Sequence, residues 1–286
     1  MMITIAEALT LGTEKLQHLP NPPFETALLL AFSLKVNRSY LIAFPEKEIT
    51  LETYQQYLNM LEQRANGEPF AYITGEREFY GLSFQVNQET LIPRDDTEII
   101  VDQALSLMPQ ATQTDYRLLD LGTGSGAIAL ALKKCRPDIA VTAVDYYETT
   151  LKIAKINGER NQLEINWFQS DWFSALPQHH FDMIVSNPPY IDPLDQHLDG
   201  DGVKFEPKRA LIAHERGLAD LYHLIDTAPN YFRKGGYLLL EHGYDQRKAL
   251  QLRMQERGYT EIRTVKDYGD QDRVTIGFFP MITVEQ

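Results

Sequence analysis

Four consecutive residues in the second half of the chain carry groups that can hold a planar nitrogen: Asn187, Pro188, Pro189 and Tyr190. An amide or exocyclic amine delocalises its lone pair, so acceptors must hold its N–H groups before the lone pair can point at an electrophile. The Asn187 side-chain oxygen and the Pro188 carbonyl can serve as these acceptors, because the two prolines stiffen the backbone. If the Tyr190 ring stacks on the planar group, positioning can promote attack of this nitrogen on an electrophile without a general base.

The same loose pattern occurs a second time, at residues 21–24 (Asn-Pro-Pro-Phe). No predicted strand precedes it, and the simpler interpretation is Asn21 as a helix cap with prolines in the first turn. Residues 187–190 differ because they follow a predicted buried strand at residues 181–185. The position after a strand, rather than the four letters, therefore makes the second copy a candidate catalytic segment.

A glycine-rich loop at residues 120–126 lies between a predicted strand and a predicted helix. Glycine lets the chain turn sharply and lets a ligand approach the backbone. Dinucleotide sites have the spacing Gly-x-Gly-x-x-Gly, and Ala127 stands where its last glycine would be. The predicted strand ends in Asp120 just before the loop, and in this it resembles the corresponding strand of methyltransferases. The expected contacts to S-adenosyl-L-methionine are Gly122, Thr123, Gly124, Ser125 and Gly126.

Two further positions can contact the cofactor. Asp145 lies 19 residues after Gly126 and ends the next predicted strand, where a carboxylate can accept bonds from ribose hydroxyls. A helix cap is the alternative interpretation, but it does not explain the strand that leads into Asp145. Asp171 can contact an adenine amino group and Trp172 can pack on the ring, although a core tryptophan at a strand end is an equally good interpretation.

The elements that must position these residues change character along the chain. Residues 1–75 predict helices, with a capping box at Thr4 and Glu7 and further helices from Pro22 and over residues 51–65. Residues 76–93 predict a β-hairpin link around Gly81. From residue 94 onward, short apolar strands alternate with helices, including a helix expected over residues 218–232.

This order predicts an α/β fold, a doubly wound Rossmann-like methyltransferase sheet with a small N-terminal helical domain. We expect three parts: a substrate-recognition domain (1–75), the hairpin link (76–93) and a methyltransferase domain (94–286).

Composition limits the partners and the location. The chain has 286 residues, a formal net charge of −13 and one cysteine. A basic surface usually grips nucleic acid, so direct nucleic-acid binding is not expected. The apolar runs are too short for a membrane helix, and no metal site is expected from the cysteine, the histidines or the acidic residues 192–201. The sequence is interpreted as that of a cytoplasmic monomer.

The motifs together resemble those of the HemK-type family, the release-factor glutamine N5-methyltransferases. The resemblance covers nearly the whole chain, and its motifs are at residues 67–75, 78–81, 91–94, 97–98, 120–126, 187–190, 206–211, 239–246 and 267–274. One departure is Asp95-Asp96, where the family usually has Pro-Glu. The order and spacing of these motifs are more specific than any one of them.

The resemblance implies methylation of the glutamine in the Gly-Gly-Gln loop of class I peptide chain release factors, with S-adenosyl-L-methionine as donor. The family's cofactor positions map onto Gly122 to Gly126, Asp145, Trp172 and Asn187, and its substrate clamp maps onto residues 187–190. Three alternatives remain open: a ribosomal-protein glutamine methyltransferase, an amino-methyltransferase of DNA or RNA, and a non-catalytic cofactor-binding scaffold. The acidic charge argues against nucleic acid, and the intact Asn187 argues against a scaffold.

Overall fold

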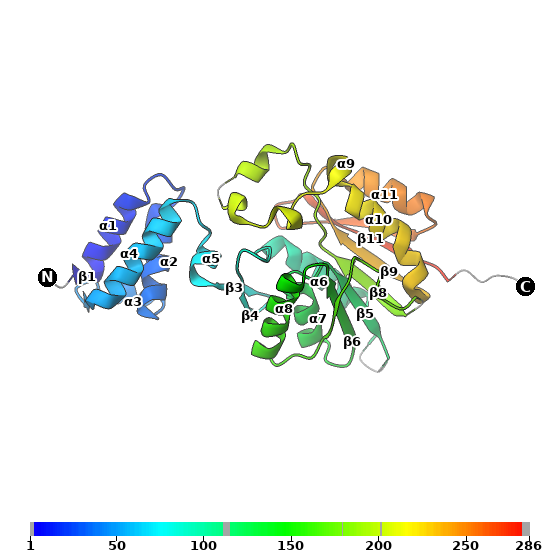
Figure 1. Cartoon of the computed structure of the whole chain (residues 1–286), viewed down its shortest axis with the longest axis horizontal. Coiled ribbons are helices and arrows are strands. Elements are labelled where there is room, and N and C mark those ends of the chain that lie inside the picture. Colours follow the sequence, from blue (N-terminus) through cyan, green and yellow to red (C-terminus); the bar gives the residue numbers. More distant parts are fainter. Residues whose placement is uncertain (1–2, 111–114, 179, 201, 282–286) are drawn as a thin grey trace, which may run out of the picture. The chain divides into compact units, whose positions relative to one another are not determined.

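The computed structural model describes residues 3–110, 115–178, 180–200 and 202–281 (Figure 1). Its backbone contacts group the chain into two units. The first contains Met1–Gly75 and Asp199–Phe205, and the second contains Glu76–Leu198 and Glu206–Gln286.

The first unit is helical. Its helices are α1 (Ile5–Lys15), α2 (Pro22–Leu34), α3 (Arg38–Ala43), α4 (Leu51–Ala65) and α5 (Phe70–Thr74), with a short β-pair of β1 (Ile3–Thr4) and β2 (Glu48–Ile49). The predicted capping box is confirmed, because Thr4 and Glu7 bond each other's backbone N–H groups. Buried side chains such as Leu29, Leu30 and Leu61 form the core between α1, α2 and α4.

Asn21 precedes α2 in the N-cap position, but its side chain makes no capping hydrogen bond. The prediction of Asn21 as a side-chain cap is therefore wrong in that detail. Two features explain why: Pro23 has no N–H at the second helical position, and the N–H of Phe24 at the third position donates to the Asn21 backbone carbonyl at 3.1 Å.

Helix α1 approaches its neighbours closely at Gly12. A Cβ added there would lie 2.1 Å from the Tyr57 hydroxyl oxygen and 2.6 Å from a methyl carbon of Thr26. Tyr57 cannot yield easily, because it is fully buried and its hydroxyl donates to the Ala8 carbonyl at 3.0 Å.

We expect Gly12→Ala to lower the free energy of unfolding of the first unit by about 1–3 kcal/mol, although alanine is the better helix former. Chemical unfolding followed by circular dichroism measures this change. Glu14→Ala is the matched control, since Glu14 is exposed on the same helix and its replacement should have almost no effect. Equal stabilities of the two variants would contradict the close packing of α1.

The second unit contains a seven-stranded sheet in the order β10-β11-β9-β8-β5-β6-β7. The parallel strands are β5 (Arg117–Leu121), β6 (Ala140–Asp145), β7 (Asn166–Gln169), β8 (Phe181–Ser186) and β9 (Phe232–Glu241). The antiparallel strands are β10 (Thr260–Lys266) and β11 (Asp272–Phe279). The predicted doubly wound α/β sheet is thereby confirmed.

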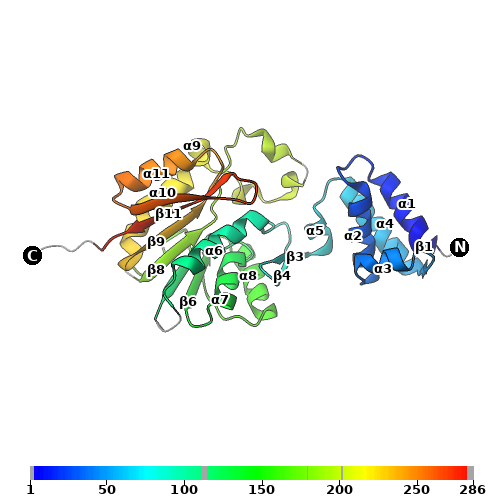
Figure 2. The same cartoon turned by 180° about the vertical axis from the view of Figure 1, so that it is seen from behind.

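Helices cover both faces of the sheet (Figures 1 and 2). One face carries α6 (Glu98–Leu107), α7 (Ala127–Cys135) and α8 (Glu148–Arg160), and the other carries α10 (Ala219–Thr227) and α11 (Arg247–Glu256). Apolar strand residues such as Leu119, Ile184 and Leu240 are fully buried between these layers. Short helical turns η1 (Asp95–Thr97), η2 (Gln196–Asp199), η3 (Val203–Phe205), η4 (Lys208–Ala210), η5 (Ala228–Tyr231) and α9 (His214–Gly217) complete the chain.

The helix expected over residues 218–232 is shorter than predicted. Helix α10 ends at Thr227, Pro229 lies in η5, and Phe232 begins β9. Gly236 allows this early strand, because a Cβ there would lie 2.3 Å from the Phe232 ring and 2.5 Å from the Asp182 carbonyl oxygen.

The expected hairpin is formed by β3 (Glu76–Phe79) and β4 (Leu82–Gln85). Asn157 of α8 bonds both backbone groups of Gln85, accepting from its N–H at 2.7 Å and donating to its carbonyl at 3.0 Å. The same amide donates to the Ser125 carbonyl at 2.9 Å. One buried side chain therefore fixes the hairpin relative to the glycine loop.

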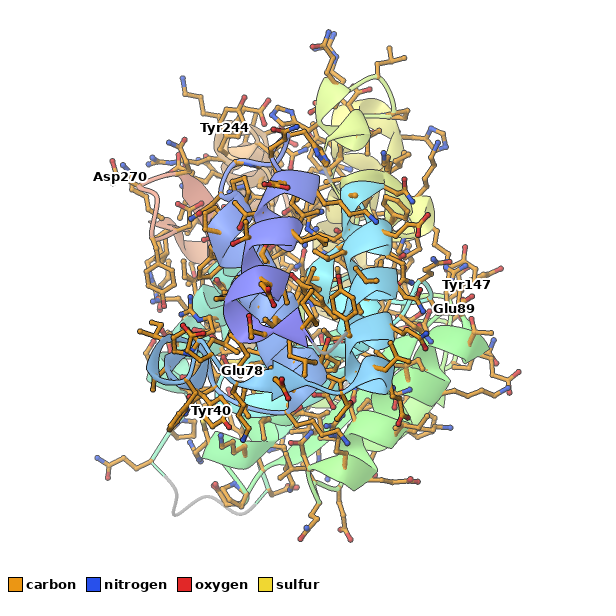
Figure 3. All side chains as sticks on the ribbon, turned by 90° about the vertical axis from the view of Figure 1, so that its left-hand side faces the viewer. Tyr40, Glu78, Glu89, Tyr147, Tyr244 and Asp270 are labelled. Carbon is orange, nitrogen blue, oxygen red and sulfur yellow. The ribbon has the colours of Figure 1, made fainter. Side chains whose placement is uncertain are left out.

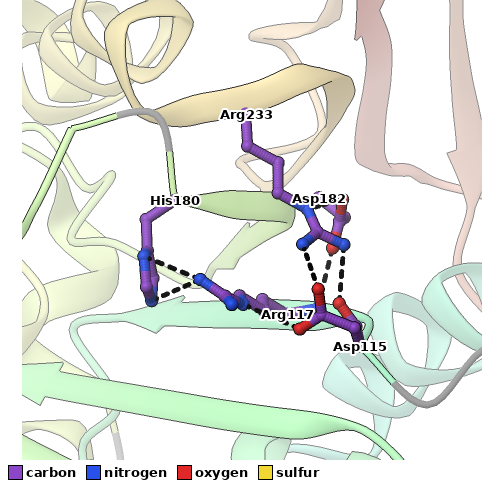
Figure 4. A network of polar contacts seen from close by, with 5 residues as sticks. All are labelled: Asp115, Arg117, His180, Asp182 and Arg233. Atoms are coloured by element: carbon purple, nitrogen blue, oxygen red, sulfur yellow. Dashed lines mark hydrogen bonds and ion pairs between the residues drawn. The ribbon is translucent and has the colours of Figure 1, made fainter.

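A polar network joins the amino ends of three strands (Figure 4). Arg233 of β9 binds Asp182 of β8 at 2.6 Å and Asp115 at 2.7 Å, and Arg117 of β5 binds Asp115 at 3.1 Å. Arg117 also contacts His180, and burial, together with the positive charges of Arg117 and Arg233, lowers the pKa of that imidazole. The network aligns the starts of the strands, leaving their carboxyl ends to form the site.

Candidate functional site

A cavity of about 250 Å³ lies at the carboxyl ends of β5, β6, β7 and β8. Parallel strands bring the loops after them to one edge of a sheet, where ligands of open α/β folds bind. Nine of the predicted site residues line this cavity: Gly122, Thr123, Gly124, Ser125, Asp145, Asp171, Trp172, Asn187 and Pro189. Gly126, Pro188 and Tyr190 are not among the residues that line it.

The glycine loop is held open by backbone contacts. Gly124 has a φ of +58°, and a Cβ added there would meet nothing within 4 Å, so this position faces free space in the cavity. Its N–H donates to Asp145 Oδ2 at 3.0 Å, and the Thr123 N–H donates to the Val144 carbonyl at 2.8 Å. Gly126 takes a different role, since it precedes α7 with a φ of +87° and starts that helix.

Asp120 stands behind this loop rather than in the cavity. Its Oδ2 accepts from the Thr123 hydroxyl at 2.6 Å and from the Ala129 N–H at 3.2 Å, while Oδ1 has no hydrogen-bond partner among the described residues. Complete burial raises the pKa of Asp120 to about 7, and the neighbouring Asp145 carboxylate adds to the rise. Asp120 thus fixes the first turn of α7 against the loop.

Asp145 and Trp172 both line the cavity next to the glycine loop. Asp145 Oδ1 accepts from the Tyr147 N–H at 3.0 Å, and burial raises the pKa of this carboxyl. Trp172 has a φ of +47°, and its ring would lie 3.3 Å from a Cβ on Gly122. The Ser170 hydroxyl donates to the Trp172 carbonyl at 2.7 Å, which holds this unusual backbone turn.

Asn187 follows β8 directly and is oriented by a residue that sequence reasoning did not place in the site. Its side-chain N–H donates to the Thr97 hydroxyl oxygen at 3.2 Å. Thr97 and Asn187 both line the cavity. Because the amide nitrogen is engaged by Thr97, the amide oxygen is the group left for a ligand.

The other residues of the tetrapeptide form its support. Pro188 is buried. The Tyr190 ring packs against the core cluster, its hydroxyl donates to Glu241 Oε1 at 3.2 Å, and its carbonyl accepts from Gln246 Nε2 at 2.9 Å. Burial raises the pKa of the Tyr190 hydroxyl. Stacking of this ring on a substrate amide stays a prediction.

One wall of the cavity was not anticipated from the sequence. Arg209 pairs with Glu89 and lies over the Tyr147 ring, with 4.2 Å from its guanidinium carbon to the ring centroid. Figure 3 shows Glu89 and Tyr147 beside each other. These three residues come from separate segments and carry no shared motif, so no sequence signal could have grouped them.

A buried carboxylate holds the segment before α6. Glu206, which is 4% exposed, accepts from the Ile92 N–H at 3.2 Å and pairs with Arg94. Arg94 lines the cavity. The two aspartates that depart from the family pattern lie next to it: Asp95 pairs with Arg77, and burial raises the pKa of Asp96.

Over the described ranges, no group of three or more His, Cys, Asp or Glu residues is arranged to hold a metal ion. Asp201, one of the four aspartates of the acidic segment, lies outside those ranges. None of the helices in the described part of the chain is both long enough and apolar enough to cross a membrane.

Both the N-terminal helical part and the α/β part of the chain are similar in sequence to known protein families. The family model described as the PrmC N-terminal domain matches residues 7–75, and the model described as the Methyltransferase small domain matches residues 98–200. The release factor glutamine methyltransferase of Shewanella oneidensis is 47% identical over 254 residues, covering 88% of each protein. The enzyme of that name from Escherichia coli is 45% identical, covering 92% of this chain and 94% of its own.

This chain belongs to the release factor glutamine methyltransferase family. The HemK-type resemblance found in the sequence is thereby confirmed. A solved methyltransferase from Pyrococcus furiosus has the same fold, with a TM-score of 0.52 and 19% identity over 78% of this chain and 98% of that one.

The residues of the cavity fit the methyl donor that this family membership leads us to expect. S-adenosyl-L-methionine combines a ribose, an adenine ring and an amino-acid tail. Asp145 can accept from ribose hydroxyls, the Trp172 ring offers an apolar face, and the open space at Gly124 admits a ligand next to the backbone. The residues that line the cavity are thus suited to hold S-adenosyl-L-methionine.

Proposed function

We propose that this chain transfers a methyl group from S-adenosyl-L-methionine to the side-chain amide nitrogen, N5, of the glutamine in the Gly-Gly-Gln motif of class I peptide chain release factors. The observation that carries the proposal is the orientation of Asn187, whose amide oxygen is left for a ligand because Thr97 engages its nitrogen. The names of relatives at 45–47% identity support the same substrate.

The chain's residues supply position rather than acid–base chemistry in this proposal. When bound, S-adenosyl-L-methionine supplies an electrophilic methyl group on a cationic sulfur. The Asn187 oxygen, and the Pro188 carbonyl as second acceptor, hold the N–H groups of the glutamine amide. The lone pair of the nitrogen then points toward the donor side of the cavity. The new C–N bond would form as the C–S bond of the donor breaks, S-adenosylhomocysteine would leave, and the nitrogen would lose one proton to solvent. Ordering the two reactants in this way can supply several kcal/mol of the barrier reduction.

The division of labour between the parts of the chain belongs to the same proposal. Residues 1–75 carry apolar helical faces and none of the residues that line the cavity. We assign them recognition of the release factor, residues 76–93 the link, and residues 94–286 the chemistry. The protein acts in the cytoplasm as a monomer and contacts neither nucleic acid nor membrane directly, as the net charge of −13 supports.

Labelled methyl donor and purified proteins test the proposed substrate. The release factors should incorporate label at the glutamine of Gly-Gly-Gln, as mapped by mass spectrometry of peptides. Ribosomal proteins and nucleic acids are the comparison substrates, since methyltransferases of those substrates share the tetrapeptide. Label on ribosomal protein or on nucleic acid, with none on release factors, would replace the proposed substrate by one of those alternatives.

The cofactor assignment predicts a large effect at Asp145. Asp145→Ala should weaken binding of S-adenosylhomocysteine by about 1.5–3 kcal/mol, the scale of hydrogen bonds to a charged group. Isothermal calorimetry measures this loss, and NADH should not bind to the unmodified protein.

Asp226→Ala is the matched control for the Asp145 measurement. The Asp226 carboxylate pairs with Arg253 and Arg257 and does not line the cavity, so affinity should be unchanged. If Asp145→Ala kept full affinity for S-adenosylhomocysteine, Asp145 would not be a cofactor-binding residue.

A further inference from the structure

Tyr147 stands at the start of helix α8 without capping it. It occupies the N-cap position, where a short side chain that accepts a hydrogen bond is usual, yet its side chain makes no capping hydrogen bond. Its ring is 38% exposed, and the residue lines the cavity two positions after Asp145. A large ring at this position does not stabilise the helix end, so its contribution lies in the cavity.

Arg209 holds the Tyr147 ring from one side. The guanidinium carbon lies 4.2 Å from the ring centroid, and a cation over an aromatic face is attracted by the negative charge of that face. Arg209 also donates to the Glu89 carbonyl at 3.3 Å and pairs with the Glu89 carboxylate. All three residues line the cavity, so this contact fixes one part of its wall.

Glu89 is tied to the first turn of α8. Its Oε2 accepts from the Thr149 hydroxyl at 2.7 Å, and its carbonyl accepts from the Thr150 hydroxyl at 2.9 Å. The contacts with Thr149 and Arg209 hold the pKa of Glu89 below its usual value, so the carboxylate is charged at neutral pH. Its negative charge offsets that of Arg209, and a guanidinium can then line a cavity for a cationic methyl donor.

We propose that Tyr147, Arg209 and Glu89 form a wall that retains the adenosine part of the cofactor. The Tyr147 ring contacts the adenosine, and Arg209 and Glu89 are positioning residues that act through the ring. The inference rests on the cofactor assignment in the proposed function. Asp145 is the residue assigned to the ribose hydroxyls, and its Oδ1 accepts from the Tyr147 N–H at 3.0 Å. The ring therefore belongs to the ribose end of the cavity.

The backbone that carries Arg209 is fixed independently of these side chains. The Ile191 N–H donates to the Leu211 carbonyl at 2.8 Å, and the Ala213 N–H donates to the Ile191 carbonyl at 3.0 Å. Ile191 directly follows Tyr190, so these bonds hold η4 beside the end of the tetrapeptide. Substitutions in the wall leave these backbone bonds in place.

Two ligands locate the contact made by Tyr147. S-adenosylhomocysteine carries adenosine and an amino-acid tail, whereas 5′-methylthioadenosine lacks the tail. Tyr147→Ala should raise the Kd of both compounds by the same factor of about 3–10, the scale of one aromatic contact. Tyr147→Phe keeps the ring and should bind both compounds as the unmodified protein does. Isothermal calorimetry measures all of these constants.

Three results would overturn the wall. The first is an unchanged Kd for both compounds in Tyr147→Ala. The second is a rise for S-adenosylhomocysteine alone, because the ring would then contact the tail. The third is an equal loss in Tyr147→Phe and Tyr147→Ala, because the hydroxyl rather than the ring would then bind the ligand. The Tyr147 N–H remains in both variants, so its bond to Asp145 is kept.

Double substitutions test the positioning roles. Arg209→Ala removes the guanidinium and should raise both Kd values about 2–5-fold. In the Tyr147→Ala background the same change should cost less than about 1.5-fold more, because Arg209 acts through the ring. Glu89→Gln should have a smaller effect that disappears in the Arg209→Ala background. Losses that multiply in either double variant would overturn the positioning roles.

The chain repeats the same arrangement away from the cavity, which gives a matched control. Arg253 pairs with Asp226 and lies over the Tyr222 ring, with 5.3 Å from its guanidinium carbon to the ring centroid, and none of the three lines the cavity. Arg253→Ala should leave both Kd values unchanged, and a loss equal to that of Arg209→Ala would overturn the proposal.

Failure of the proposed function would show differently. An unmodified protein that bound neither compound would overturn the cofactor assignment together with the wall. Normal binding of both compounds without methylation of release factors would overturn the proposed substrate alone, and the comparison of Tyr147 and Arg209 variants would still decide on the wall.

Discussion

Asn187→Ala should lower single-turnover methylation of a release factor by a factor on the order of 10²–10⁴, the range seen when positioning or a charge-stabilising contact is lost. The side-chain oxygen of Asn187 is the acceptor left for the substrate amide, and alanine cannot replace it. Binding of S-adenosylhomocysteine should fall much less, since other residues also form the cofactor wall. Asn187→Asp keeps an acceptor but adds a negative charge, so an intermediate rate is expected.

The chain contains its own control for this experiment at Asn21. Asn21 opens the same loose pattern, but its side chain makes no capping bond. Asn21→Ala should therefore leave methylation unchanged and cost less stability than the roughly 1 kcal/mol of a lost cap. Thermal melts and single-turnover rates on both variants complete the test. If a folded Asn21→Ala protein lost methylation while Asn187→Ala kept a normal rate, the assignment of catalysis to residues 187–190 would be wrong.

Removal of residues 1–75 should abolish methylation of an intact release factor while leaving binding of S-adenosylhomocysteine largely unchanged. The reason is that all residues lining the cavity lie between Glu89 and Asp220, outside the removed segment. Calorimetry of cofactor binding and label incorporation into whole release factors measure the two properties separately. The truncated protein would also have to show a cooperative melt.

A short peptide containing Gly-Gly-Gln provides the matched substrate for the truncation. Peptide and whole factor share the reacting amide, and only the whole factor offers a distant surface. For each substrate, the rate of the truncated protein is divided by the rate of the full chain. This ratio should be much higher for the peptide than for the whole release factor. A normal rate on whole release factor would show that residues 1–75 do not recognise it.

The sequence predicted the parts of the site that directly follow a strand. The glycine loop, Asp145 and Asn187 each end a short apolar run, and parallel strands bring such ends together. Orientation could not be predicted in the same way. Thr97 contacts Asn187 across 90 residues, and Tyr190 contacts Glu241 across 51. These contacts depend on which strands lie side by side, and that arrangement cannot be predicted from the sequence around any one of the residues.

The fold was predicted where hydrophobic periodicity is strong and less well elsewhere. Helix α4 matches the expected residues 51–65, because its apolar face repeats clearly. Strand β10 was not predicted, since residues 260–266 at the edge of the sheet hold only two apolar side chains, Ile262 and Val265, whose spacing of three does not give the alternation that marks a strand. The end of α10 was misplaced because the expected helix ran through Pro229, which has no N–H to continue an α-helix; the helix ends at Thr227 and Pro229 lies in η5.

The position of β9 within the sheet has a consequence for the order of folding. Its neighbours are β8 and β11, so Glu241 reaches its place only when late parts of the chain have paired. Helices α1, α2 and α4 instead pack through contacts that lie within the first 75 residues, so these contacts can form before the later strands have been synthesised. During synthesis we expect the helical unit to be folded while the site is still absent. Activity would therefore be among the last properties a newly made molecule acquires.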